Sequence, residues 1–186
     1  MATPGIKAAD TTLENLQAAY NGESNAHAKY AEFAKKADAE GYHQVASMFR
    51  AASRAEEIHA QNHARVIRRM GAEPVATIEA HPAKSTRENL QVAIEGETYE
   101  RDTMYPAFIK EAEAAGNAAA VRTFKAALEA EKEHARMYTV AINNLEHMKV
   151  ATKYYVCAIC GYTVPKLVFD RCPVCNAPGE RFEEIS

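Results

Sequence analysis

The chain has 186 residues, of which 47% are hydrophobic and 25% are charged, and its formal net charge is −3. These values are typical of a globular protein, and the weak negative charge gives no reason to expect nucleic acid or a membrane surface as a partner. The sequence has no run of about 18 apolar residues, so we predict no membrane-spanning helix. Its first residues lack the charged and then apolar plan of a secretory signal, so we expect a cytoplasmic protein.

The sequence contains two copies of one unit. Residues 11–24 (TTLENLQAAYNGES) match residues 85–98 (STRENLQVAIEGET) at an offset of 74 positions. Further along the chain, Tyr30 matches Tyr105 at an offset of 75 positions. Chance does not produce a match of this length, so we interpret it as an internal duplication.

Each copy is predicted to form a pair of long helices. A capping-box pattern, in which a hydroxyl residue precedes a glutamate by three positions, marks one helix start at Thr11 and another at Ser85. Glycines mark the ends of these two helices, at Gly41 and Gly116. The second helices of the two copies are expected at residues 42–70 and 117–147.

A loop with two prolines, Pro74 and Pro82, separates the copies at residues 71–85 and is expected to be a crossover. Two antiparallel helix pairs joined by one long crossover give an all-α four-helix bundle of ferritin-like topology. Pro106 interrupts the third helix and is expected to kink it.

After Met148 the sequence changes to short runs of Tyr, Val, Cys, Gly and Pro. We expect a linker at residues 148–153, and we divide the chain into a bundle domain, residues 1–150, and a small β domain, residues 151–186. Domains below about 40 residues bury little apolar surface and usually need a metal or disulfides to fold. The small domain, called the tail below, is therefore expected to hold a metal.

Carboxylates and imidazoles recur at matching positions of the two copies. Each first helix supplies one glutamate, and each second helix supplies a Glu-x-x-His pair, whose members share a helix face. An isolated pair of this kind is usually a solvated surface pair, but recurrence in register favours a metal site. Two such pairs with two single glutamates suit two iron or manganese ions. The set consists of Glu23, Glu56, His59, Glu97, Glu131 and His134.

Glu100 has no counterpart in the first copy, where Ala26 stands. Two ferrous ions and four carboxylates form a neutral site, and oxidation adds two positive charges. A fifth carboxylate that approaches would offset part of this change, so we predict that Glu100 is a ligand of the oxidised site.

Other candidate residues surround this set. Tyr30 and Tyr105 are expected either to donate hydrogen bonds to ligand carboxylates or to be ordinary core tyrosines. Three further histidines are expected either on the surface or next to the ligands without binding the metal. These are His27, His63 and His81.

The tail holds all four cysteines as two Cys-x-x-Cys pairs, which is typical of a four-thiolate metal site. The ligands are expected to be Cys157, Cys160, Cys172 and Cys175. Tetrahedral thiolates suit iron or zinc, and zinc would be structural only. We expect one-electron iron, because a redox site beside a di-iron site makes chemical sense.

The chain resembles the rubrerythrin family over essentially its whole length, through the combination of the Glu and His set, Glu100 and a rubredoxin-like pair of cysteine knuckles. The resemblance implies a non-haem di-iron peroxidase that reduces hydrogen peroxide to water in oxidative-stress defence. It implies that electrons come from a pyridine nucleotide through a separate reductase to a mononuclear iron in the tail. It also implies that one iron moves between His59 and Glu100 with redox state. Zinc is left open as an alternative to iron in either site of the isolated protein.

The expected geometry also suggests an oligomer. A helix from His134 to Lys149 would run about 22 Å, so we expect the cysteines to lie far from the di-iron site of their own chain. A head-to-tail homodimer, which the resemblance implies, would bring the tail of one chain against the bundle of the other.

Two other functions fit parts of the sequence. A ferroxidase or iron-storage protein would use the same bundle, although storage needs no redox tail. A non-enzymatic protein could use a zinc-binding tail to recruit a partner, and the metal content of the tail distinguishes that case.

Overall fold

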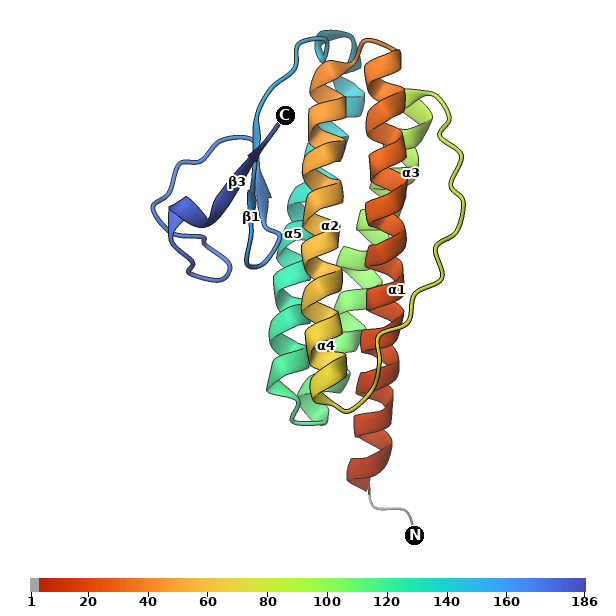
Figure 1. Ribbon diagram of the computed structural model, residues 1–186, viewed down its shortest axis with the longest axis vertical. Coiled ribbons are helices and arrows are strands. Elements are labelled where there is room, and N and C mark those ends of the chain that lie inside the picture. The colour runs from red at the N-terminus through yellow and green to blue at the C-terminus, as the bar shows by residue number, and fades with distance from the viewer. Residues whose placement is uncertain (1–3) are drawn as a thin grey trace.

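The computed structural model describes the backbone of residues 4–186 and the side chains of residues 11–186. Long helical rods stand side by side, and the tail lies against one side of them (Figure 1). The rods are α1 (Pro4–Ala39), α2 (His43–Arg69), α3 (Thr86–Tyr99) continued by α4 (Tyr105–Ala114), and α5 (Ala118–Asn143). The predicted four-helix bundle with a small β domain is therefore confirmed, and the division at residue 150 stays a prediction. No helix in the described residues is long and apolar enough to cross a membrane.

The helix ends follow local sequence signals, with one exception. Ser85 and Glu88 form the predicted capping box at the start of α3, each side chain bonding to the other's backbone. Gly41 and Gly116 take positive φ angles of 80° and 66° directly after their helices, a conformation that glycine adopts without steric cost. The capping box predicted at Thr11 is wrong, because α1 begins at Pro4 and Thr11 lies inside it.

A π-helical turn at Glu100–Met104 joins α3 to α4. The Tyr105 N–H donates to the carbonyl of Glu100, five residues back, where an α-helix would use the fourth. The repeat offset changes from 74 to 75 across this segment, so the turn absorbs one extra residue of the second copy. Pro106, which lacks an N–H and disfavours a regular helix before it, follows directly. The irregularity expected at this proline is therefore a π-helical turn.

Two aromatic clusters pack the bundle above and below its middle, and the duplication relates them. In one cluster the rings of Tyr30 and Phe49 lie 5.7 Å apart, and in the other those of Tyr105 and Phe124 lie 6.0 Å apart. These four side chains are at most 2% exposed. Both clusters therefore exclude water from the layer of carboxylates that lies between them.

Amide side chains on α1 hold the crossover loop. Gln17 bonds to the backbone of Glu73 and Val75, and Asn21 accepts a 2.8 Å bond from the Thr77 N–H. Asn25 continues the series with bonds to Thr77 and Glu79. The three amides are four residues apart on the helix, which is a rise of about 6 Å. Two residues of extended chain span about 6.6 Å, so each amide lies opposite a loop residue two positions further along. The loop is thus fixed along the bundle without secondary structure of its own.

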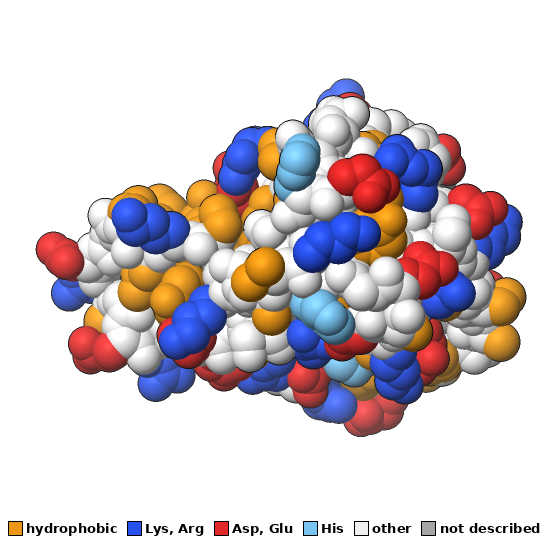
Figure 2. Space-filling view, turned by 90° about the horizontal axis from the view of Figure 1, so that it is seen from above, with side chains coloured by type: hydrophobic (Ala, Val, Ile, Leu, Met, Phe, Trp, Pro, Cys, Tyr) orange, Lys and Arg blue, Asp and Glu red, His pale blue; other side chains and the backbone are white. Residues whose placement is uncertain are grey.

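The tail is an antiparallel three-stranded sheet in the order β2–β1–β3. Its strands are β1 (Tyr154–Cys157), β2 (Thr163–Val164) and β3 (Phe182–Ile185). Figure 2, which looks down on the bundle, shows the tail as a lobe projecting to one side.

The tail is anchored to α2 of its own chain. Tyr154 and Val156 on β1 are buried in the same apolar cluster as the bundle residues around Phe49. Arg54 on α2 makes a two-pronged contact with Glu183 on β3, at 2.7 and 3.0 Å. A paired guanidinium and carboxylate fix orientation as well as distance.

Candidate metal centres

The six residues predicted from the repeat converge at the middle of the bundle, and each is at most 1% exposed. They form two overlapping groups whose potential ligand atoms all lie within 4.8 Å of one another. Both groups contain Glu56 and Glu131. The first group adds Glu23 and His59, and the second adds Glu97 and His134. This arrangement offers each of two ions a carboxylate and an imidazole of its own, with two glutamates shared between them.

Most of these carboxylate oxygens lack a hydrogen-bond partner among the described residues. Both oxygens of Glu131 and one each of Glu23, Glu56 and Glu97 are buried and unpaired. His134 Nδ1 lies 2.9 Å from Glu131 without the geometry of a hydrogen bond. Buried charged oxygens are costly unless cations balance them, so this set of donors fits a pair of divalent metal ions.

The carboxylates also perturb one another strongly. Burial and the charge of Glu56 raise the pKa of Glu131 to about 8. Burial and the charge of Glu23 likewise raise the pKa of Glu56. Burial acts in the same direction on Glu23, but the neighbouring His59 and His63 outweigh it and hold the pKa of Glu23 well below its ordinary value. Glu131 therefore keeps a proton near neutral pH, and metal binding displaces it.

Two tyrosines orient the unshared glutamates. Tyr30 donates a 2.7 Å hydrogen bond to Glu97, and Tyr105 donates one to Glu23. Burial and the nearby carboxylates raise both tyrosine pKa values well above the ordinary value, so both hydroxyls keep their protons. Each bond crosses between the two copies of the repeat, which ties the bundle halves together at the site.

His63 lies in the core beside the ligands and not on the surface, which is the second of the two positions expected for it. It is 0% exposed, and its Nε2 lies 3.2 Å from the Tyr105 hydroxyl while its Nδ1 lies 3.0 Å from Thr123. The repeat offset of 75 relates it to Tyr138, a buried tyrosine that packs against Tyr30. The same offset that found the glutamates would have found this pair. His27 and His81 are half-buried and outside both groups.

Glu100 belongs to neither ligand group. It is half-buried at the start of the π-helical turn, one helical turn after Glu97. Burial and the charges of Glu23 and Glu97 raise its pKa well above the ordinary value. Its carboxyl group is therefore close enough to be affected by the charges of the cluster, but it does not lie among the converging ligand atoms.

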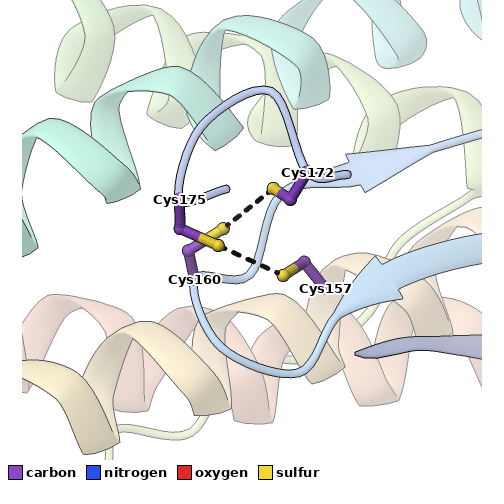
Figure 3. Close-up of side chains that lie close together, drawn as sticks. All are labelled: Cys157, Cys160, Cys172 and Cys175. Atoms are coloured by element: carbon purple, nitrogen blue, oxygen red, sulfur yellow. Dashed lines mark hydrogen bonds between the residues drawn. The ribbon is translucent and has the colours of Figure 1, made fainter. Parts of the chain in front are cut away.

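The four cysteine sulfurs form a compact cluster (Figure 3). Two of the sulfur pairs, Cys157 with Cys175 and Cys160 with Cys172, are separated by 3.6 Å. A metal bound at about 2.3 Å by four sulfurs requires sulfur separations of about 3.8 Å, which these distances approach. A disulfide would need about 2 Å. The cluster therefore fits one tetrahedral ion.

The two cysteine knuckles have the same backbone plan. The N–H of Gly161 donates to the carbonyl of Cys157 at 2.8 Å, and the N–H of Asn176 donates to that of Cys172 at 2.9 Å. Gly161 and Asn176 both take positive φ angles, 80° and 60°. Glycine and asparagine tolerate this conformation best, which allows each loop to close around its sulfurs.

The tail lies directly against the carboxylate cluster of its own chain. His59 Nε2 lies 3.1 Å from the carbonyl oxygen of Cys160. A carbonyl can only accept, so Nε2 carries a proton, while Nδ1 faces the cluster and lies 2.9 Å from a Glu56 carboxylate oxygen. A bound metal ion would take the place of the proton on Nδ1. Asn62 adds a 3.0 Å bond to the Ile159 carbonyl. Within a single chain, the expectation that the cysteines lie far from their own di-iron site is wrong, because the chain turns back after α5 and β1 packs against α2.

Gly161→Ala is expected to separate the knuckle from His59. An added Cβ would lie 2.3 Å from His59 Nε2 and 3.1 Å from the Ala55 carbonyl, and the φ of 80° is unfavourable for alanine. We expect a loss of about 1–3 kcal/mol in the free energy of unfolding and slower electron exchange between the metal sites. Denaturant titration and rapid-mixing spectroscopy measure the two effects. Gly179→Ala, which crowds only the tail near Asp170, is the control and should leave the exchange rate unchanged.

Tyr30→Phe is expected to weaken iron binding in the bundle by about 10-fold, because partners that orient a ligand typically contribute 10–100-fold to metal affinity. Competition with a chelator measures this affinity. Tyr138→Phe is the matched control, since its hydroxyl has no hydrogen-bond partner among the described residues. An equal loss in both variants would assign the effect to the loss of any buried hydroxyl near the site and contradict the role given to the bond from Tyr30 to Glu97.

Comparison with known proteins identifies both parts of the chain. The rubrerythrin family model matches residues 14–142, and the rubredoxin-like domain of rubrerythrin matches residues 155–183. The chain is 42% identical to nigerythrin of Nitratidesulfovibrio vulgaris over 94% of its length and 87% of that protein. It is 33% identical to rubrerythrin of Porphyromonas gingivalis, covering 94% of this chain and 90% of the relative.

Solved structures agree with this grouping. Nigerythrin in its fully reduced, all-ferrous state superposes with a TM-score of 0.86 at 42% identity, over 93% of this chain and 86% of the other. A bacterioferritin of Desulfovibrio desulfuricans shares the bundle fold, with a TM-score of 0.71 at 21% identity over 78% of this chain and 86% of the other. The chain carries a di-iron centre in its Glu and His cluster and a rubredoxin-like iron site in its four cysteines. It belongs to the rubrerythrin family of oxidoreductases.

Proposed function

We propose that the protein is a peroxidase that reduces hydrogen peroxide to two molecules of water, taking up two electrons and two protons for each peroxide. Two ferrous ions held by the Glu and His cluster would supply the two electrons, and iron held by the four thiolates would carry one electron at a time. The ligands of the pair are Glu23, Glu56, His59, Glu97, Glu131 and His134, with Glu100 as a further ligand after oxidation. The role in oxidative-stress defence follows from this reaction.

The contact between His59 and Cys160 is the observation that carries the proposal. His59 faces the di-iron cluster through Nδ1 and the Cys160 carbonyl through Nε2, at 3.1 Å. A path from the cluster to the Cys160 sulfur therefore consists of covalent bonds and one hydrogen bond. A storage site has no use for such a path, whereas a reaction that consumes electrons repeatedly does.

The surrounding residues fit a small, reactive substrate. The two aromatic clusters keep bulk water from the carboxylates, and the Tyr30 and Tyr105 hydroxyls hold Glu97 and Glu23 in fixed orientations. Glu100 lies outside both ligand groups. We expect it to approach the cluster when oxidation increases the positive charge of the metal ions. These residues bind, orient and exclude water, and none of them forms a pocket for a large organic substrate.

Iron handling is the second candidate, because the bundle has the fold of a bacterioferritin. A ferroxidase would consume oxygen and deposit iron without needing the tail. The peroxidase is favoured because the tail contacts a predicted iron ligand through Cys160.

If the protein is a peroxidase, hydrogen peroxide should reoxidise the reduced iron sites faster than oxygen does. Iron-loaded protein is reduced fully without air and then mixed with one equivalent of hydrogen peroxide or, separately, of oxygen. We expect the colour of the oxidised cysteine-bound iron to return quickly with peroxide and slowly with oxygen. Cys172→Ser, which removes one sulfur ligand, controls for direct oxidation of the bundle. A tail that stays colourless, or a reaction with oxygen alone, would refute the peroxidase and favour iron handling.

We also propose a head-to-tail homodimer in which the tails are exchanged, so that the contact between His59 and Cys160 forms between two chains. The exposed linker after Met148, with Val150 at 77% exposure, supports this exchange because little packing holds it to its own bundle. We further propose a cytoplasmic location, because a site of four thiolates requires cysteines that stay reduced.

Mixed dimers test the exchange. One chain carries His59→Ala, and the other carries Cys172→Ser, each purified with a different tag. In an exchanged dimer, one bundle and one tail remain intact and face each other, so we expect about half of the wild-type peroxide turnover for each mixed dimer. With each tail on its own bundle, no intact pair exists. Turnover near zero in mixed dimers would therefore rule out the exchange.

A further inference from the structure

A cavity of about 280 Å³ opens between the tail and the bundle, beside the cysteine cluster. Three basic side chains line its bundle wall, two from α2 and one from α5. These are Arg65, Arg69 and Arg122. The tail wall contains Cys160, Cys175 and Ile159, so positive charge lies directly beside the thiolate site.

The three arginines form a concentration of unbalanced charge. All three are exposed, and none forms an ion pair with a described side chain. The cavity lining contains no carboxylate, although the chain as a whole carries a net charge of −3. The neighbouring Arg68, by contrast, lies 3.9 Å from Glu73. Like charges held together without a counter-ion indicate a surface suited to an anionic partner.

Hydrogen bonds fix part of this surface to the tail. Arg65 donates to Asn62 and to the Gln61 carbonyl, and Asn62 in turn donates to the Ile159 carbonyl at 3.0 Å. The position of Arg65 is thus coupled to the first cysteine knuckle. A partner that binds this guanidinium is therefore held at a fixed position relative to the cysteine ligands.

Cys175 is the ligand that a partner can approach most closely. It is half-buried, whereas the other three cysteines are buried. Ile159 beside it is 42% exposed and offers an apolar contact. Protein interfaces commonly combine an apolar centre with a polar rim, and Ile159 and the arginines offer both.

We propose that this surface docks a one-electron carrier protein through carboxylates that bind Arg65, Arg69 and Arg122, so that the carrier's redox group lies next to Cys175. The inference rests on the proposed function, which requires the tail to receive electrons. One electron leaves the carrier, which is oxidised, and reduces the cysteine-bound iron, with no bond or proton transferred.

A dinucleotide fits this site less well than a protein does. The cavity, at about 280 Å³, lies at the lower limit of the roughly 300–1,000 Å³ typical of pockets for organic ligands, whereas a dinucleotide is a large ligand. A reduced pyridine nucleotide also transfers a hydride, which carries two electrons, whereas the cysteine-bound iron accepts one. Charge complementarity and electron number both favour a protein carrier with an acidic face.

The test compares two donors on the iron-loaded protein by stopped-flow bleaching of the cysteine-bound iron. The first is a reduced plant-type [2Fe–2S] ferredoxin chosen for an acidic net charge, and the second is reduced methyl viologen, a small cation. We expect Arg69→Gln with Arg122→Gln to slow reduction by ferredoxin about 10-fold or more at low salt and to flatten its salt dependence, because steering by opposite charges accelerates association. The ratio of the ferredoxin rate to the viologen rate should fall by the same factor.

Lys110→Gln with Lys166→Gln is the matched control, since both lysines are exposed and neither lines the cavity. An equal effect in the control, or an equal slowing with both donors, would overturn the docking surface. Direct, arginine-dependent reduction by NADH would overturn it in favour of a nucleotide site. Failure of the peroxidase is distinguishable, because reduced protein would then not be reoxidised by peroxide in any variant.

Discussion

Four carboxylates and two imidazoles lie within the core of this bundle, and the rest of the structure depends on how their charge is balanced. The ligand atoms of each group lie within 4.8 Å of one another, where two like charges repel by about 3 kcal/mol at an effective dielectric constant of 20. Protons relieve this repulsion in part, as the raised pKa values of Glu56 and Glu131 indicate. Two iron ions relieve it fully, so the bundle core and the metal centre stabilise each other.

The duplication explains why the two halves of the site carry equivalent ligands. The positions at which the two copies differ make the halves unequal. Two equivalent helix pairs supply equivalent ligands, and Tyr30 and Tyr105 cross from one copy to the other in the same way. The two halves of the site nevertheless differ in two places. One extra residue in the π-helical turn accompanies Glu100, and His63 stands where the other half has Tyr138. Each departure lies on one side of the site only.

The tail turns this buried centre into one that can exchange electrons with the outside. Its knuckle lies so close to His59 that glycine is required at position 161, and Arg54 with β1 holds the sheet on α2. In the proposed electron path, electrons enter at the half-buried Cys175 and pass toward the cluster through Cys160. The same domain thus provides an outer face for a partner and an inner face for the di-iron site.

The sequence alone determined the helices, the duplication and the ligand types, because helical period, capping residues and Cys-x-x-Cys spacing are local properties of the chain. It also indicated the crossover, through its prolines, and the unusual status of Glu100. Only the tertiary structure decided that His63 is buried, that the extra residue forms a π-helical turn, and that the tail packs on α2 beside His59. These outcomes depend on contacts between residues as far apart as His59 and Cys160, which no local pattern specifies. The distance estimate failed for that reason: helix length fixes where α5 ends, but packing of β1 against α2 decides where the chain goes next.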